Sequence, residues 1–198
     1  MAGTSGAAEK CGDHGLAKKD KGARSEMTKL FVFDLDGTLA DLTHRLYLIQ
    51  NPLRNENSDE IVEKGPEFIK KYQNWKPDWP SFYRSSVNDS PKQWVIDLLN
   101  LVRKQGEVLI LSGRSDEVKG YTTDWLHDKG VLYDYLVMRE AGSHEPDDKL
   151  KATMLDDFLK DKDFKVQFIV DDRQRVINMW LEKGYQVLQI ANALGGNY

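Results

Sequence analysis

Short, nearly unbroken runs of apolar residues recur along the chain, and several end directly at a polar or acidic position. Such runs, set between turn residues, are typical of strands that are buried on both faces of a parallel sheet. The runs cover residues 30–33, 108–111, 135–138, 166–170 and 185–190. We therefore predict five strands in one central parallel sheet.

Apolar side chains at helical spacing fill the intervals between the later runs. Ser90 and Pro91 have the pattern of an N-cap followed by proline in the first turn, which predicts a helix to about residue 104. Ser115 is expected to cap a second helix, to about residue 129, and two more are expected at 148–160 and 172–183. Alternating strands and helices predict an α/β fold with helices on both faces of the sheet.

The first two predicted strands are separated by about seventy residues, far more than the dozen or so that a plain crossover needs. We predict a small helical cap insertion at about 42–90, with helices near 59–73 and 79–87. Its aromatic side chains are Tyr47, Phe68, Tyr72, Trp75, Trp79, Phe82 and Tyr83. Two interpretations remain open: the aromatic rings fill a small core of the insertion, or the insertion covers an active site and one or two rings stack on a base.

The chain has 198 residues, of which 40% are hydrophobic, and its 28 basic and 32 acidic side chains leave a net charge of −4. This size predicts one domain, or one domain with a tail, and enough apolar residues for a folded core. A mildly acidic chain is not expected to bind nucleic acid over its whole surface, although a local basic patch could hold a strand end. The single cysteine, Cys11, excludes an internal disulfide framework and a cysteine-built zinc site.

Residues 1–26 contain almost no large apolar side chain, so burial cannot offset the entropy cost of ordering them. We expect a flexible tail or a segment added for expression, with Met27 as the natural start and residues 27–198 as the folded domain. No apolar run approaches the roughly 18 residues of a membrane span, and the N-terminus lacks an apolar secretory core. The cytoplasm is therefore the expected compartment, that of the host if the protein is encoded by a phage.

Candidate chemistry lies where the predicted strands end. Asp34 and Asp36, in the segment Asp-Leu-Asp-Gly-Thr-Leu, directly follow the first strand. Ligands of open α/β sheets bind at the carboxyl ends of the strands. Two carboxylates this close repel each other unless a cation lies between them, and their hard oxygen atoms suit a divalent ion. The motif therefore predicts a metal site at this end of the sheet.

Three later segments offer groups that complement this acidic pair. The Ser112 hydroxyl and the backbone N–H groups near Gly113 have the arrangement of a phosphate cradle before a helix. Lys151, inside a predicted helix, offers an ammonium for a carboxylate and a transferring phosphoryl group. Asp171 and Asp172 form a second acidic pair at the end of another predicted strand. Each segment alone also fits an ordinary turn or surface charge, so their joint order carries the argument.

In that order, the motifs resemble those of the haloacid-dehalogenase-like (HAD) phosphohydrolase superfamily over about residues 29–192. The segments 112–114, 146–151 and 170–180 look like the 3′-phosphatase domains of phage polynucleotide kinase/phosphatases, and Arg45 falls where those domains have a substrate-side arginine. The resemblance implies a Rossmann-like HAD fold and a Mg²⁺ cofactor. Two features differ from the phage proteins: the phosphate-binding loop of the kinase half is missing, and the insertion is longer.

The resemblance also implies a role for each site residue. Asp34 would attack phosphorus, Asp36 would act first as general acid and then as general base, and Lys151 would bind phosphoryl oxygens. Contacts to phosphate or substrate are implied for Arg45, Ser112, Gly113 and Arg114, and an orienting contact to Lys151 for Asp147. The implied Mg²⁺ ligands are Asp34, the backbone carbonyl of Asp36, and Asp171 or Asp172.

The resulting hypothesis is a Mg²⁺-dependent phosphomonoesterase that removes 3′-phosphates from nucleic-acid ends or nucleotides, with a separate kinase or ligase as a partner it does not require. A nucleotidase or small-metabolite phosphatase would use the same chemistry on another substrate. A catalytically silent binding module is the third alternative, which the retained Asp34, Asp36 and Lys151 argue against. Lysines and arginines of the insertion are balanced by acidic residues, so a long electrostatic channel for a polynucleotide is not expected.

Overall fold

The computed structural model describes residues 27–53 and 58–191, with the side chains of 58–62 left aside. Its centre is a five-stranded sheet in the order β5-β4-β1-β6-β7, and every neighbouring pair is parallel. The strands are β1 (Thr28–Phe33), β4 (Glu107–Ser115), β5 (Tyr135–Arg139), β6 (Phe164–Asp171) and β7 (Val187–Gln189). All five predicted strands and their parallel arrangement are confirmed. The predictions for residues 1–26, including Cys11, lie outside the described residues.

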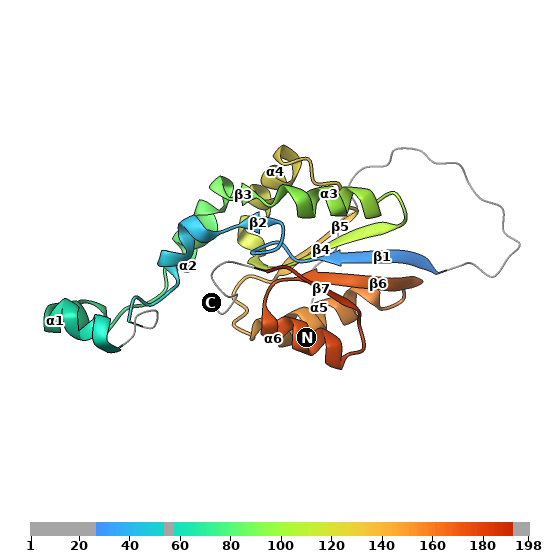
Figure 1. The fold of residues 1–198 in the computed structure, drawn as a ribbon. Coiled ribbons are helices and arrows are strands. Elements are labelled where there is room, and N and C mark those ends of the chain that lie inside the picture. Colours follow the sequence, from blue (N-terminus) through green and yellow to red (C-terminus); the bar gives the residue numbers. More distant parts are fainter. Residues whose placement is uncertain (1–26, 54–57, 192–198) are drawn as a thin grey trace, which may run out of the picture.

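Helices cover both faces of this sheet (Figure 1). One face carries α3 (Gln93–Val102) and α4 (Lys119–Asp128), and the other carries α5 (Asp147–Leu159) and α6 (Gln174–Glu182). Successive residues of β1 point to opposite faces, as the pleat of a strand requires. Phe31 and Phe33 join the core under α3 and α4, whereas Leu30 and Val32 join the core under α5 and α6. Burial on both faces is why β1 has a run of apolar residues instead of an alternating pattern.

Two helix starts differ in how well the sequence predicted them. Ser90–Pro91 is not the start of a helix but the two-residue strand β3, antiparallel to β2 (Ala40–Asp41). The helix α3 begins at Gln93 with Lys92 as its N-cap, and the backbone N–H of Lys92 donates to the carbonyl of Leu39. Proline fits this short edge strand because it removes only one backbone donor. Ser115 does act as a cap: it accepts from the N–H of Glu117 at the start of η3 (Asp116–Val118), which leads into α4.

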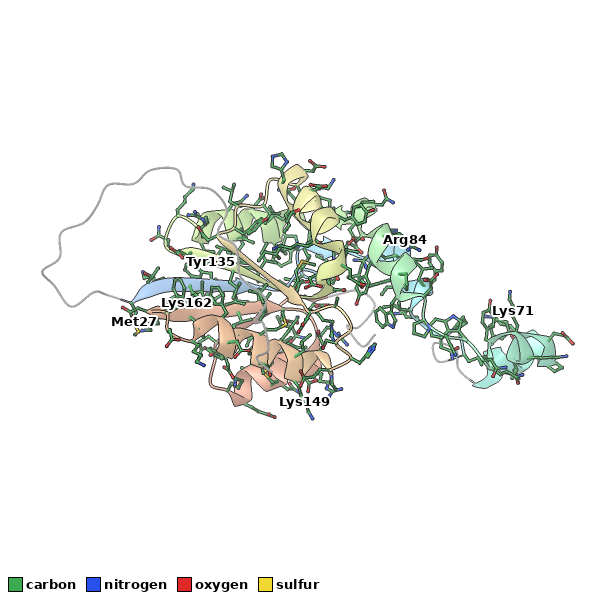
Figure 2. The ribbon with its side chains drawn as sticks, turned by 180° about the vertical axis from the view of Figure 1, so that it is seen from behind. Met27, Lys71, Arg84, Tyr135, Lys149 and Lys162 are labelled. Atoms are coloured by element: carbon green, nitrogen blue, oxygen red, sulfur yellow. The ribbon has the colours of Figure 1, made fainter. Side chains whose placement is uncertain are left out.

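Helical elements occupy the long interval between β2 and β3: η1 (Thr43–Leu48), α1 (Ser58–Tyr72), α2 (Trp79–Arg84) and η2 (Ser85–Asn88). Figure 1 shows α1 standing away from the sheet, whereas α2 lies close to it; in Figure 2, Lys71 and Arg84 mark these two positions. Phe82 of α2 packs with Leu42 and Leu46 in a small core of their own. Trp79, by contrast, is 45% exposed. In the described ranges, none of the helices has the length and apolar character that crossing a bilayer requires.

Candidate active site

The carboxyl ends of β1, β4, β5 and β6 meet around a cavity of about 120 Å³. Its floor and walls come from the strand ends, from α5 and from the insertion. The lining residues are Asp34, Asp36, Leu42, Ile49, Trp79, Phe82, Tyr83, Gly113, Arg139, Asp147, Lys151 and Arg173. The cavity therefore lies where open α/β sheets bind their ligands.

Lys151 and Asp34 form a buried ion pair in this cavity. The Nζ atom of Lys151 donates to Oδ1 of Asp34 at 2.7 Å and to Oδ2 of Asp171 at 2.9 Å, and all three side chains are at most 5% exposed. Burial by itself would lower the pKa of Lys151, but the carboxylates of Asp171, Asp34 and Asp147 raise it well above its ordinary value. Lys151 is therefore held as a cation among carboxylates.

The surroundings of Asp34 disfavour its charged form, whereas those of Lys151 favour the charged form of the lysine. Burial raises the pKa of Asp34 well above its ordinary value; Lys151 lowers it, and the negative charges of Asp171 and Asp172 raise it again. Ligand oxygens of Asp34, Asp171 and Asp172 all lie within 4.8 Å of one another, and all three residues are buried. Lys151 lies against Asp34 and Asp171, and the charge of Lys92 acts on Asp172, so the three buried carboxylates exceed the two ammonium groups by one negative charge. A divalent cation with a preference for oxygen ligands, such as Mg²⁺, fits both this donor set and this charge.

The side chain of Asp36 lies apart from these three carboxylates and is held by two arginines. Its Oδ1 accepts from Nη2 of Arg45 at 2.5 Å and from Nη2 of Arg114 at 2.7 Å, and its Oδ2 accepts from Nε of Arg114 at 2.9 Å. Although burial alone would raise the pKa of Asp36, the guanidinium groups of Arg114 and Arg45 lower it strongly. The two arginines thus keep the carboxylate of Asp36 ionised.

Asp89 is a part of this site that the sequence did not reveal. Its fully buried carboxylate accepts from Nε and Nη2 of Arg45, at 2.7 and 2.6 Å, and from Nη2 of Arg114 at 2.8 Å. His44 lies 2.9 Å from the same carboxylate. Asp89 follows η2 inside the segment Asn-Asp-Ser, and nothing in that local pattern indicates a buried ion pair. Two arginines and two aspartates therefore form one network, with Asp36 on the cavity side and Asp89 behind.

Arg45, Arg114 and Ser112 are three of the residues for which the resemblance implied contacts to phosphate or substrate. All three are fully buried, and the described residues that line the cavity do not include them. The Ser112 hydroxyl accepts from the backbone N–H of Arg114, in the part of β4 where the pairing with β5 is irregular. The structure thus brings the two arginines to Asp36, and the cationic groups that do line the cavity, besides Lys151, are Arg139 and Arg173.

Gly113 and Asp147 lie on the cavity wall. Asp147 is 3.8 Å from Lys151, 3.1 Å from Arg173 and 3.4 Å from Arg139, measured between carboxylate oxygens and side-chain nitrogens. A β-carbon at Gly113 would collide with Oδ1 of Asp147. Glycine at this position therefore allows Asp147 to reach the cations of the site.

Arg139 and Arg173 also line the cavity, and no motif of the sequence singled them out. Arg139 is the last residue of β5, and Arg173 lies two positions after Asp171, the last residue of β6. The Nε of Arg139 donates to the carbonyl of Gly113, and its Nη1 donates to the carbonyl of Glu145. The rule that strand ends carry site residues, applied to basic residues as well, would have found both arginines.

Fold and site together define a phosphatase domain of the HAD superfamily. The family model described as polynucleotide kinase PNKP phosphatase domain matches residues 80–194 of the chain. Since this match covers more than half of the sequence, the chain belongs to that family of phosphatase domains. No curated relative matches the chain at the level of its sequence.

Solved structures share the fold. A structure of the Pnkp1/Rnl/Hen1 complex matches with a TM-score of 0.62 at 22% identity, over 92% of this chain and 53% of that chain. A structure of the Pnkp1/Rnl/Hen1 RNA repair complex gives a TM-score of 0.58 at 22% identity, over 88% and 44%. The HAD-hydrolase YfnB from Bacillus subtilis, bound to magnesium, gives 0.54 at 13% identity, over 86% and 90%. The chain thus spans about half the length of the two repair-complex chains that it matches.

Proposed function

We propose that the chain is a Mg²⁺-dependent phosphomonoesterase that works through an aspartyl-phosphate on Asp34 and removes 3′-phosphates from polynucleotide ends or nucleotides. The observation that carries this proposal is the buried contact of Lys151 with Asp34 and Asp171 inside the cavity. Membership in a family of polynucleotide kinase phosphatase domains supports a nucleic-acid substrate.

In the first step, an oxygen of Asp34 forms a bond to phosphorus while the bond from phosphorus to the substrate 3′-oxygen breaks. Lys151 stabilises the negative charge on the phosphoryl oxygens, and Asp147 keeps Lys151 in place. In the second step, water attacks phosphorus, inorganic phosphate leaves, and Asp34 is regenerated. Asp34, Asp171, Asp172 and the backbone carbonyl of Asp36 would hold Mg²⁺, which when bound offsets the charge of carboxylates and phosphate.

Asp36 would move the protons of both steps. In its ionised form, held by Arg45 and Arg114, it is ready to take a proton from the attacking water. To protonate the departing 3′-oxygen in the first step, it must carry a proton, which the two guanidinium groups disfavour. We therefore assign Arg45 and Arg114, together with Asp89, to setting the charge state and position of Asp36.

The same proposal extends to domains and partners. We assign residues 27–198 to the phosphatase domain and residues 42–90 to a cap, since Trp79, Phe82 and Tyr83 of α2 line the cavity beside the strand ends. The likeness to chains of an RNA repair complex supports a separate kinase or ligase as a partner.

The test is Mg²⁺-dependent phosphate release from a 3′-phosphorylated oligonucleotide, its 5′-phosphorylated counterpart, and 3′- and 5′-mononucleotides. We expect the 3′-phosphorylated substrates to be preferred, and Asp34→Asn to lower kcat by at least about 10³-fold with an unchanged circular dichroism spectrum. Asp128→Asn, an exposed position on α4, is the matched control. Release of phosphate by Asp34→Asn at the wild-type rate would refute the mechanism.

A nucleotidase acting on mononucleotides is the second candidate, and one observation favours it. Glu117, Glu140 and Glu145 line a second cavity next to the first, so a long strand would bring its phosphates close to carboxylates. Turnover of 3′-mononucleotides equal to that of the oligonucleotide would select this candidate.

A further inference from the structure

A second, larger cavity of about 500 Å³ adjoins the first, a volume within the range of small-molecule sites. Trp79, Tyr83 and Arg139 line both cavities, so the two hollows share one wall. The other lining residues are Ser115, Glu117, Glu140, Gly142, Ser143, His144 and Glu145. A substrate whose phosphate reaches Asp34 and Lys151 would therefore extend along the shared wall into the second cavity.

The shared wall is aromatic. The rings of Trp79 and Tyr83 are stacked, with centroids 5.8 Å apart and planes at 27°. Trp79 is 45% exposed, so part of its side chain is open to a ligand in the second cavity. Nucleobases stack on such rings whichever of the bases is present, because every base has a π face.

This wall is held in a fixed position relative to Asp36. Phe82, between the two rings in sequence, is buried, and its carbonyl accepts from Nη1 of Arg45 at 3.2 Å. The guanidinium of Arg45 also lies 4.0 Å from the centroid of the Phe82 ring. Arg45 also donates a hydrogen bond to Asp36, so its side chain connects the aromatic wall with the Asp36 carboxylate of the first cavity. Asp78 further fixes the start of α2 by accepting from the N–H of Ser81.

The charges of the second cavity indicate which part of a substrate it takes. Glu117, Glu140 and Glu145 are all exposed, and His144 and Arg139 are the only basic residues among the described lining. The guanidinium of Arg139 is occupied by the carbonyls of Gly113 and Glu145. Carboxylates repel a phosphodiester and accept hydrogen bonds from amino groups, so the ligand here carries N–H donors and no phosphate. A nucleobase meets both conditions.

We propose that the second cavity is a nucleobase site, in which the base of the nucleotide that carries the 3′-phosphate stacks on Trp79 and Tyr83. The inference rests on the proposed function, because the phosphate of that nucleotide must occupy the first cavity. This site recognises only the terminal nucleotide, because Glu117, Glu140 and Glu145 repel the preceding phosphodiester from the second cavity.

The experiment compares two 3′-phosphorylated oligonucleotides that differ only in the last residue, which is an ordinary nucleotide in one and an abasic sugar in the other. We expect wild-type kcat/KM to favour the base by about 5- to 100-fold, as expected for loss of one stacked base. Trp79→Ala is expected to bring this ratio close to one, and Trp79→Phe to keep most of it. Trp94→Ala, a 60% exposed tryptophan of α3, is the matched control and keeps the wild-type ratio.

Each outcome has a distinct meaning. A wild-type ratio near one, or a ratio that Trp79→Ala leaves unchanged, overturns the nucleobase site while the 3′-phosphatase activity stands. Release of phosphate from neither oligonucleotide by the wild-type protein overturns the proposed function, and the nucleobase site with it.

Discussion

The Nζ atom of Lys151 lies 2.7 Å from Oδ1 of Asp34, although 117 positions separate the two residues in the sequence. Asp34 follows β1, and Lys151 lies in the second turn of α5, so only the packing of that helix against the sheet brings them together. The contact is buried on both sides. It makes Lys151 the counter-charge of Asp34 and Asp171 and places an ammonium in the cavity.

Replacing Lys151 by methionine is expected to destabilise the protein by about 3–5 kcal/mol, because buried carboxylates lose their compensating charge. Urea unfolding measures the change. Lys149→Met is the control, since Lys149 is exposed and Figure 2 labels it on the outer side of α5. We further expect added Mg²⁺ to recover part of the lost stability, because a cation at the acidic cluster compensates the same charge. Equal stability of the two variants would contradict this role of Lys151.

Asp89→Asn is expected to lower both stability and turnover. Removing the carboxylate leaves two buried guanidinium groups facing Asp36 alone, which costs about 3–5 kcal/mol. The resulting shift of Asp36 is expected to reduce kcat by about 10²-fold. Thermal unfolding and phosphate release are measured side by side with Asp124→Asn, an exposed aspartate of α4. If Asp89→Asn unfolds like the wild type and keeps its pH profile of kcat, Asp89 does not position Asp36.

Gly113→Ala tests the close approach of Asp147 to the carboxyl end of β4. The added methyl group would displace the carboxylate of Asp147, so we expect a cost of about 1–3 kcal/mol and a clear loss of kcat. Gly120→Ala, in helix α4, is the matched substitution because its β-carbon meets no described atom within 4 Å. It is expected to be neutral or to stabilise the protein by up to about 1 kcal/mol. Equal activity of the two variants would show that Asp147 is not held through Gly113.

Mg²⁺ is expected to raise the melting temperature of the protein, since a ligand that binds only the folded state stabilises it in proportion to the logarithm of its concentration. Asp171→Asn removes one of three clustered carboxylates and should weaken this effect, so that more Mg²⁺ is needed for half of the shift. Differential scanning fluorimetry over a Mg²⁺ series, with a chelator as the starting point, measures it. A melting temperature that does not respond to Mg²⁺ in the wild type would rule out a metal at this cluster under those conditions.

The sequence predicted the sheet well, because each strand is a local feature. The runs at β1 and β4 are buried on both faces, and their apolar character depends only on their own residues. Ser90 and Pro91 were misread as a helix start, since the same two residues also suit an edge strand and only the pairing with Ala40 and Asp41 decides between the two. Local pattern cannot distinguish structures that depend on a distant partner.

For the candidate site, the sequence indicated which residues take part but not how they are paired. Asp34, Asp147 and Lys151 were found from their motifs, and the structure places them around one cavity. Arg45 and Arg114 were also found, yet the structure places them behind Asp36, against the carboxylate of Asp89. Asp89 carries no motif of its own, because its importance comes from the two cations that meet it.

The order of apolar runs and strand-end carboxylates therefore determined, by itself, an α/β fold with acidic residues at the carboxyl ends of the strands of its sheet. Only the tertiary structure decided which charges neutralise one another, which arginines face the cavity, and that Trp79 and Tyr83 form its wall. The physical reason is the separation along the chain of the residues that each property depends on. Strand formation and burial follow from neighbouring residues, whereas the charge state of a buried carboxylate depends on atoms within a few ångströms in space, contributed by segments far apart along the chain.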